Sequence, residues 1–208
     1  MIISDTKQFI FIHNPKAGGT SIRDVLHEYA TVGVWQHKVN ERLPVGNNKF
    51  LSKHVTASRI RDYVGLDKWN NYFTFAFIRN PWDLIVSQYL YAKRHIKAAK
   101  HNLARGSFKD FVLWYDNKWA KNCAQPLRIF SQLHYIGDGI TPIVAFVGRF
   151  ERMNVDFEKI CNRLDIKHAL PHLNKTKHGH YRVFYNAKTQ SIVRRLYAND
   201  IEAFGYKF

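Results

Sequence analysis

The chain has 208 residues, of which 46% are hydrophobic and 15% aromatic, and this composition excludes an intrinsically disordered protein. The length suits one α/β domain with a substantial core, so we expect residues 1–208 to form a single domain. The net charge of +16 indicates an anionic partner: by charge alone, a nucleic acid, an acidic polysaccharide, a nucleotide or an anionic membrane surface.

The first predicted elements are a buried strand over residues 8–13, a turn of small residues, and a helix over 21–29. Ser21 and Asp24 have the spacing of a capping box, which predicts that the helix begins at Ser21. Backbone N–H groups at a helix N-terminus bind anions, and glycines let the backbone approach a ligand closely. The turn therefore predicts a phosphate or sulfate site. The same residues also fit a tight turn with a solvated lysine.

Within this turn, one lysine supplies positive charge, two hydroxyl groups can donate hydrogen bonds, and two glycines free the backbone. The residues of the candidate site are Lys16, Ala17, Gly18, Gly19, Thr20 and Ser21. In a Walker A motif the lysine follows the glycines, whereas here it precedes them. This order argues against a nucleotide triphosphatase.

The middle of the chain contains a polar stretch over residues 33–53, a short helix over 57–64 and a strand over 72–78. Gly65 stands where the C-terminus of the short helix is expected. Residues 72–78 are almost all apolar, which is typical of a strand covered on both faces, as in a parallel sheet.

A second candidate anion site follows that strand. Asn80, Pro81 and Asp83 have the positions of a helix N-cap, a first turn and an acidic residue near the positive end of the helix. Arg79 can hold a phosphate with a bidentate fork, and the hydroxyl of Ser87, about two turns into the helix, can complete the site. Alternatively, Arg79 pairs with a local carboxylate and Ser87 only packs.

The second half of the chain predicts a helix that starts at residues 107–110, a buried strand over 143–147, a helix containing residues 160–164, and a closing amphipathic helix over 192–201. Strands that alternate with helices predict an α/β fold with a mostly parallel central sheet flanked by helices. In such sheets ligands bind beyond the carboxyl ends of the strands, where both candidate anion sites lie.

The two motifs together resemble the cofactor signatures of sulfotransferases that use 3′-phosphoadenosine 5′-phosphosulfate (PAPS). They cover residues 15–21 and 79–87. The chain is most similar to the carbohydrate-type group, which includes heparan 2-O-sulfotransferases and small bacterial relatives. Similarity extends to residues 53–61, 170–178 and 200–206, and so to nearly the whole chain.

This resemblance implies a P-loop-NTPase-like three-layer fold and an in-line transfer of the sulfuryl group to an acceptor hydroxyl. PAPS would be the co-substrate and 3′-phosphoadenosine 5′-phosphate (PAP) the product, with no metal. Lys16 and the turn around it would bind the 5′-phosphosulfate, and Lys16 would also stabilise the charge that develops on the leaving oxygen. Arg79 and Ser87 would bind the 3′-phosphate.

His54 is the candidate general base, because it follows a predicted extended segment at a position similar to that of the catalytic histidine in the 2-O-sulfotransferase-like group. The chain has 11 histidines, so chance placement is the competing explanation. His13 precedes the anion turn, and we expect it to orient the turn or to pack. A loop is expected to cover the donor or the acceptor, or else to be a solvated basic loop; its residues are Asn174, Lys175, Thr176 and Tyr181.

The acceptor is expected to be a hydroxyl-bearing molecule, and the basic charge favours an acidic glycan. The charge is also compatible with peripheral contact with an anionic membrane, and no nucleic-acid-binding signature is present. Cys123 and Cys161 are expected to be reduced, and no apolar run is long enough to span a bilayer, so we expect a cytoplasmic protein without a signal peptide. Two alternatives stay open: an atypical nucleotide-dependent kinase and a non-catalytic polyanion-binding protein.

Overall fold

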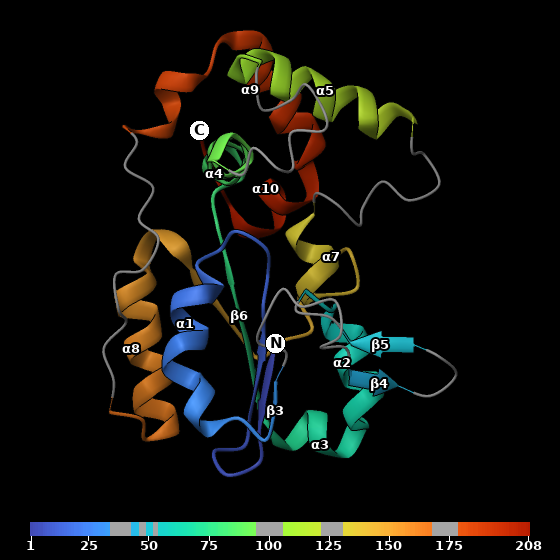
Figure 1. Cartoon of the computed structure of the whole chain (residues 1–208), viewed down its shortest axis with the longest axis vertical. Coiled ribbons are helices and arrows are strands. Elements are labelled where there is room, and N and C mark those ends of the chain that lie inside the picture. The colour runs from blue at the N-terminus through green and yellow to red at the C-terminus, as the bar shows by residue number, and fades with distance from the viewer. Residues whose placement is uncertain (34–42, 46–48, 52–53, 95–105, 122–130, 168–178) are drawn as a thin grey trace. The chain divides into compact units, whose positions relative to one another are not determined.

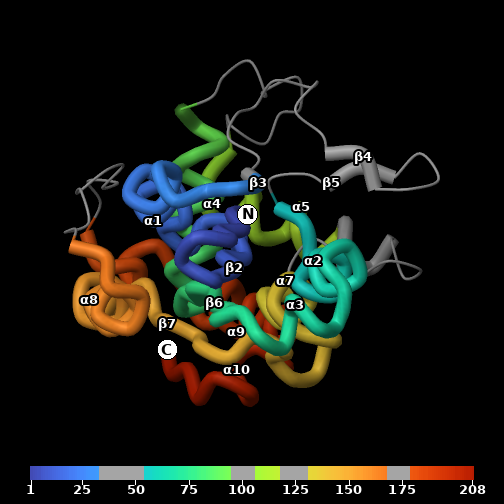
Figure 2. Tube along the Cα trace, turned by 90° about the horizontal axis from the view of Figure 1, so that it is seen from below, coloured from blue at the N-terminus to red at the C-terminus, as the bar shows by residue number. Residues whose placement is uncertain are grey.

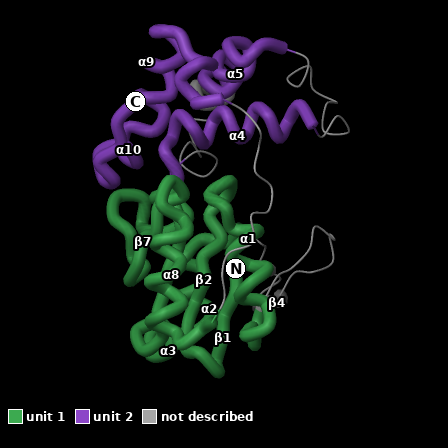
Figure 3. The backbone as a smooth tube through the Cα atoms, turned by 90° about the vertical axis from the view of Figure 1, so that its left-hand side faces the viewer, with its two compact units in different colours: residues 1–78, 132–174 green, residues 79–131, 175–208 purple. Residues whose placement is uncertain are grey.

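The computed structural model describes residues 1–33, 43–45, 49–51, 54–94, 106–121, 131–167 and 179–208. These residues belong to two compact units, shown in separate colours in Figure 3. Unit 1 comprises residues 1–78 and 132–174, and unit 2 comprises residues 79–131 and 175–208. The single domain over residues 1–208 stays a prediction.

Unit 1 contains a five-stranded sheet in the order β3-β1-β2-β6-β7. The strands are β1 (Ile2–Ser4), β2 (Phe9–Ile12), β3 (Val32–Gly33), β6 (Phe73–Ile78) and β7 (Phe146–Arg149). β6 runs parallel to both β2 and β7, whereas β1 runs antiparallel to β2 and β3. Four strands therefore point the same way, which confirms the mostly parallel sheet. A separate two-stranded sheet pairs β4 (Leu43–Val45) with β5 (Lys49–Leu51).

Helices cover both faces of this sheet, as Figures 1 and 2 show from two directions. On one face lie α1 (Gly19–Leu26), which continues as the 3-10 helix η1 (His27–Tyr29), and α8 (Met153–Leu164), which follows the 3-10 helix η4 (Phe150–Arg152). On the other face lie α2 (Ala57–Val64), α3 (Leu66–Asn71) and α7 (Gln132–Ile136). The three-layer α/β fold expected from the sequence is confirmed.

The main core lies between the sheet and the helices α1 and α8. Side chains alternate between the two faces of a strand, so β2 and β6 direct four phenylalanines to one face, all at most 1% exposed: Phe9, Phe11, Phe75 and Phe77. They pack with Ile22 of α1 and Ile160 of α8 in one cluster. The intervening side chains, such as Ile10 and Ile12, are buried on the opposite face. Burial on both faces explains the nearly continuous apolar sequence of these strands.

Unit 2 is helical in the residues that the structure describes. It consists of α4 (Pro81–Arg94), α5 (Phe108–Lys121), the 3-10 helix η5 (Tyr181–Phe184), α9 (Ala187–Leu196) and α10 (Ala198–Phe204). Its interior is aromatic: the ring of Phe108 makes edge contacts with Tyr89, Phe184 and Tyr185. The start of α4 is as predicted, because the Asn80 side chain accepts a hydrogen bond from the Trp82 N–H at 3.0 Å.

Three elements differ from the sequence prediction. The first helix begins at Gly19 rather than Ser21, because the Gly18 carbonyl already accepts the first helical hydrogen bonds from Ser21 and Ile22. The predicted capping box is therefore absent, and Asp24 instead pairs with Arg23. The strand predicted over residues 143–147 is the edge strand β7, over Phe146–Arg149. The closing helix is two helices, α9 and α10, because the backbone leaves the helical region at Tyr197 (φ −113°, ψ 25°).

Candidate functional site

The candidate anion turn lies directly beyond the carboxyl end of β2 in unit 1. Two of its residues have left-handed backbone conformations: Lys16 with φ 62° and Gly18 with φ 79°. Such a conformation costs a lysine free energy that a glycine does not pay, so the fold must hold Lys16 in place. The turn ends where α1 begins at Gly19, and the first N–H groups of a helix, here those of Gly19 and Thr20, have no acceptor within the helix.

Both glycines of the turn are closely packed. A Cβ atom built at Gly18 would lie 1.9 Å from the Met153 methyl group of α8, and one built at Gly19 would lie 2.3 Å from the His13 ring. Ala17 is 1% exposed and belongs to the main core. One side of the turn therefore packs against the core. The start of α1 packs against the His13 ring, so tertiary packing determines the conformation of the turn.

Asn14 ties the turn to the neighbouring strand. Its side-chain amide donates to the Phe77 carbonyl oxygen at 2.9 Å and to the Gln132 Oε1 at 3.2 Å. Asn14 is 3% exposed, so these are buried hydrogen bonds that anchor the end of β2 to the end of β6 and to α7. The sequence analysis did not single out Asn14. The only signal for it is a polar side chain placed directly between a buried strand and the turn.

His54 contacts His13, which lies 41 residues earlier in the chain and precedes the same turn. Its Nδ1 is 2.9 Å from the His13 carbonyl oxygen, and the two imidazole rings meet edge to face with centroids 4.7 Å apart. A carbonyl oxygen can only accept, so Nδ1 carries the hydrogen in the neutral ring. The lone pair of neutral His54 is then on Nε2, the arrangement that a general base requires.

In unit 2, Arg79 pairs with a local carboxylate. Its Nε donates to the Asp83 Oδ2 at 2.8 Å, one helical turn along, and the Arg79 side chain is only 6% exposed. Ser87 is 4% exposed on the packed face of α4. Arg79 therefore makes the ion pair that the alternative prediction describes. Asp83 fixes the direction of the guanidinium group.

Of the four residues predicted to form a covering loop, one lies among the described residues and three do not. Tyr181 is not in a loop but opens the 3-10 helix η5, where its ring packs against His180 and Phe208. Its hydroxyl oxygen lies 3.5 Å from the Asn80 side-chain nitrogen, at the start of α4. The other three, Asn174, Lys175 and Thr176, lie outside the described residues, as does Cys123.

Burial raises the pKa of two further groups that could in principle react. The pKa of the Tyr185 hydroxyl is raised first by burial and then by the charge of Asp83, so this hydroxyl stays protonated and donates to the Trp82 carbonyl oxygen at 2.8 Å. The pKa of the Cys161 thiol is raised mainly by burial in the core, which disfavours the reactive thiolate. Neither group is a candidate nucleophile.

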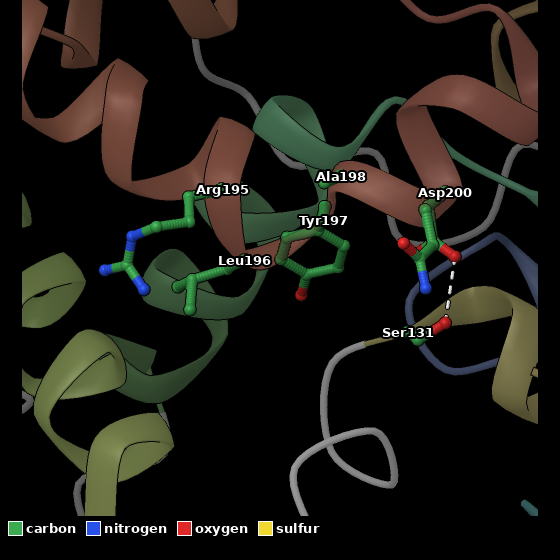
Figure 4. A pocket seen from close by; sticks show the side chains of 7 residues that line it. Ser131, Arg195, Leu196, Tyr197, Ala198 and Asp200 are labelled. Atoms are coloured by element: carbon green, nitrogen blue, oxygen red, sulfur yellow. Dashed lines mark hydrogen bonds between the residues drawn. The ribbon is translucent and has the colours of Figure 1, made fainter.

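A small cavity of about 70 Å³ lies within unit 2 (Figure 4). It is lined by Ser131, Arg195, Leu196, Tyr197, Ala198, Asn199 and Asp200. The Ser131 hydroxyl donates to the buried Asp200 carboxylate at 3.0 Å, a hydrogen bond between two of the lining residues. Pockets for drug-sized ligands are about 300–1,000 Å³, so this cavity is too small for a nucleotide.

Among the described residues, no group of three or more His, Cys, Asp and Glu side chains is arranged to hold a metal ion. None of the helices that the structure describes combines the length and the apolar character needed to cross a membrane. The cytoplasmic location stays a prediction.

The sequence of nearly the whole chain matches a protein family: a sequence model of the sulfotransferase family covers residues 1–207. The chain belongs to the sulfotransferase family. A protein of Archaeoglobus fulgidus, described as uncharacterized, is 33% identical to it over 132 residues, which are 62% of this chain and 98% of that protein. Family membership supports sulfuryl transfer as the class of reaction.

The fold is also similar to that of a solved sulfotransferase. The crystal structure of mouse sulfotransferase SULT7A1 complexed with PAP superposes with a TM-score of 0.52 over 96% of this chain and 85% of that one. The two sequences are 13% identical. This likeness confirms the sulfotransferase-type fold of the chain.

The packing of the turn generates a stability prediction. Gly18→Ala and Gly205→Ala both place an alanine in the left-handed region, which costs about 1–2 kcal/mol. Only the first also sets the new methyl group against the end of the Met153 side chain and 3.2 Å from Cδ2 of the Phe150 ring, so both side chains must shift. No atom of the described residues lies within 4 Å of a Cβ at Gly205. Gly18→Ala should therefore lower the free energy of unfolding by about 1 kcal/mol more than Gly205→Ala, measured by chemical denaturation. Equal losses would contradict the described packing of the turn.

Proposed function

We propose that this protein is a sulfotransferase that moves the sulfuryl group of PAPS to an acceptor hydroxyl, on a carbohydrate, and releases PAP. We further place it in the carbohydrate-type group that includes the heparan 2-O-sulfotransferases. The observation that supports the proposal is the contact of His54 with His13, which precedes the anion turn in unit 1; a base at His54 would then lie near the motif that we assign to the phosphosulfate. The sequence resemblance and membership of the family support it.

The anion turn suits the 5′-phosphosulfate end of the donor. The left-handed conformations at Lys16 and Gly18 shape the turn, and the N–H groups at the start of α1 offer hydrogen bonds to anionic oxygens. In the donor, one oxygen bridges sulfur and phosphorus. Negative charge develops on this oxygen as its bond to sulfur breaks. Lys16 and the amides of Gly18, Gly19 and Thr20 would stabilise that charge, whereas the Ser21 N–H donates to the Gly18 carbonyl oxygen.

His54 would act as the general base. The acceptor oxygen forms a bond to sulfur while the bond from sulfur to the bridging oxygen breaks, and the hydroxyl proton passes to Nε2 of His54. The carbonyl of His13 holds the Nδ1–H side of the ring, so the ring meets the acceptor in the protonation state that can accept. The resulting imidazolium returns its proton to solvent before the next turnover.

In unit 2, we assign Arg79 and Ser87 to the 3′-phosphate. Asp83 holds the Nε side of Arg79, so the phosphate would be met through the Nη side of the planar guanidinium. Tyr181 would contribute to donor binding from the start of η5, with Asn174, Lys175 and Thr176 preceding it in the chain. These roles follow the sequence resemblance.

The net charge of +16 favours an acidic glycan as the acceptor, because an electropositive protein raises the local concentration of polyanions. The same charge would allow peripheral contact with an anionic membrane surface. No metal enters the proposed reaction.

Ligand-induced stabilisation separates this proposal from its alternatives. PAP without added magnesium should raise the melting temperature, and by more than ATP at the same concentration, because a ligand that binds the folded state stabilises it by mass action. The measurement is a thermal unfolding series at fixed protein concentration. Stronger protection by magnesium and ATP would instead favour a kinase, and the absence of a response to both nucleotides would favour a non-catalytic polyanion-binding protein.

Lys16→Ala and His54→Ala should both lower kcat, but for different reasons. Loss of a positioned base costs about 10²–10⁴-fold in rate, and His54→Ala should still bind PAP with near-normal affinity. Lys16→Ala should reduce both the transfer rate and PAP affinity, since it removes a charge next to the donor. The measurements are steady-state transfer rates and PAP titrations.

Matched controls are available in unit 1. His27 also places its Nδ1 against a backbone carbonyl oxygen, that of Asp24 at 2.7 Å, and the Lys7 Nζ donates to the Asp165 carbonyl oxygen at 2.8 Å. His27→Ala and Lys7→Ala should leave transfer unchanged. Full activity of His54→Ala would remove His54 as the base.

Arg79→Ala should chiefly weaken nucleotide binding. Hydrogen bonds to charged groups contribute about 1.5–3 kcal/mol, which corresponds to a rise of about 10- to 100-fold in the Kd for PAP. Arg79→Lys keeps the charge but loses the planar fork, so its Kd should be intermediate. The control is Arg195→Ala, since Arg195 also pairs with an aspartate in unit 2, Asp116. An unchanged Kd in Arg79→Ala, measured by titration calorimetry, would exclude Arg79 from the 3′-phosphate site.

A further inference from the structure

His13 contacts both the start of α1, where the anion turn ends, and the candidate base His54. It directly follows β2, it is 3% exposed, and its ring stacks on Phe11 of the same strand. It contacts His54 through both its backbone and its ring. We infer that His13 is a positioning residue, which holds the imidazole of His54 in a fixed relation to the anion turn; the inference rests on the proposed function of both.

The first contact is between the His13 ring and the start of α1. A Cβ atom at Gly19 would lie 2.3 Å from Cδ2 and 2.4 Å from Nε2 of His13, so the ring lies directly against the backbone of the first helical residue. A buried planar ring at this point fixes the position, relative to β2, of the N–H groups in the first turn of α1.

The second contact is with His54, and it has two parts. The His13 carbonyl oxygen accepts from Nδ1 of His54 at 2.9 Å, which fixes the tautomer. The edge-to-face contact of the two rings, with centroids 4.7 Å apart and planes at 79°, fixes the rotation of the His54 ring about that hydrogen bond. Together they determine the direction in which Nε2 points.

One residue thus contacts both parts of the proposed site: its ring touches the helix start that we assign to the phosphosulfate, and its carbonyl and ring hold the proposed base. The rate of proton transfer and of in-line attack depends steeply on such alignment, and a displacement of about 1 Å can cost about 10²-fold. His13 itself needs no contact with the donor or the acceptor to exert this effect.

The first test is spectroscopic and does not depend on catalysis. Nitrogen-15 NMR of the histidine rings reports which nitrogen carries the hydrogen, and His54→Gln identifies the His54 signals. Neutral His54 should be protonated at Nδ1 in the wild-type protein and in His13→Phe, which keeps a planar ring. In His13→Ala the backbone carbonyl remains, so His54 should stay protonated at Nδ1, but its ring should become mobile about that hydrogen bond, which lowers the NMR order parameters of its ring C–H bonds. Wild-type His54 protonated at Nε2, or a His54 ring as rigid in His13→Ala as in the wild-type protein, would overturn the inference.

The second test separates positioning from binding. In His13→Ala, kcat should fall by about 10²-fold, whereas the Kd for PAP and the KM for the acceptor should change by no more than about threefold. His13→Phe should recover most of the lost kcat. Ile160→Ala, a core change in α8, should lower stability with no loss of kcat, and it controls for a general loss of folding.

The outcomes separate this inference from the proposed function. Wild-type transfer with an unchanged kcat in His13→Ala would overturn the role of His13 alone. A parallel loss of PAP affinity and kcat in His13→Ala would also overturn it, since the ring would then only support the turn. Absence of any transfer by the wild-type protein, with the rigidity of the His54 ring still dependent on the His13 ring, would overturn sulfuryl transfer and support the positioning contact.

Discussion

The pairing of β2 with its parallel neighbour β6 is the constraint on which the candidate site depends. Ile12 lies opposite Ala76, so the two strands end at the same edge of the sheet. Asn14 closes that edge by donating to the Phe77 carbonyl oxygen at 2.9 Å. The anion turn leaves β2 there, and Arg79 follows β6 directly in the chain. Both candidate anion sites therefore begin at the carboxyl ends of adjacent parallel strands, where α/β sheets bind ligands.

The turn and the base depend on this edge in different ways. The turn is local: Lys16, Gly18 and Gly19 follow β2 within seven residues, and packing against Met153 and His13 determines their backbone. His54 comes from a distant segment and is joined to the turn through a carbonyl oxygen, that of His13. A backbone acceptor holds the candidate base without adding another titratable partner at that nitrogen. The result is a candidate base near a candidate anion site, within one compact unit.

Much of this arrangement could be predicted from the sequence because its signals are local. The apolar run before Asn80 predicts β6, and Asn80 with Pro81 predicts the start of α4. The start of α1 was predicted two residues too late, because glycine is a poor helix former and only the left-handed turn at Gly18 shows where the helix begins. The break at Tyr197 was missed because the apolar periodicity continues from α9 into α10. The roles of Asn14 and of the His13 carbonyl depend on tertiary contacts, which no local pattern contains.

The central claim is transfer of a sulfuryl group to a carbohydrate hydroxyl, and its most direct test is the fate of labelled sulfur. The purified protein is incubated with sulfur-labelled PAPS and a panel of acidic polysaccharides, neutral oligosaccharides and tyrosine peptides, without added metal. We expect a labelled sulfate ester on a carbohydrate, with one PAP released for each ester formed. Label on the peptides alone would contradict the carbohydrate acceptor. If PAPS binds but none of these acceptors becomes labelled, the result would contradict the proposed sulfotransferase activity toward them.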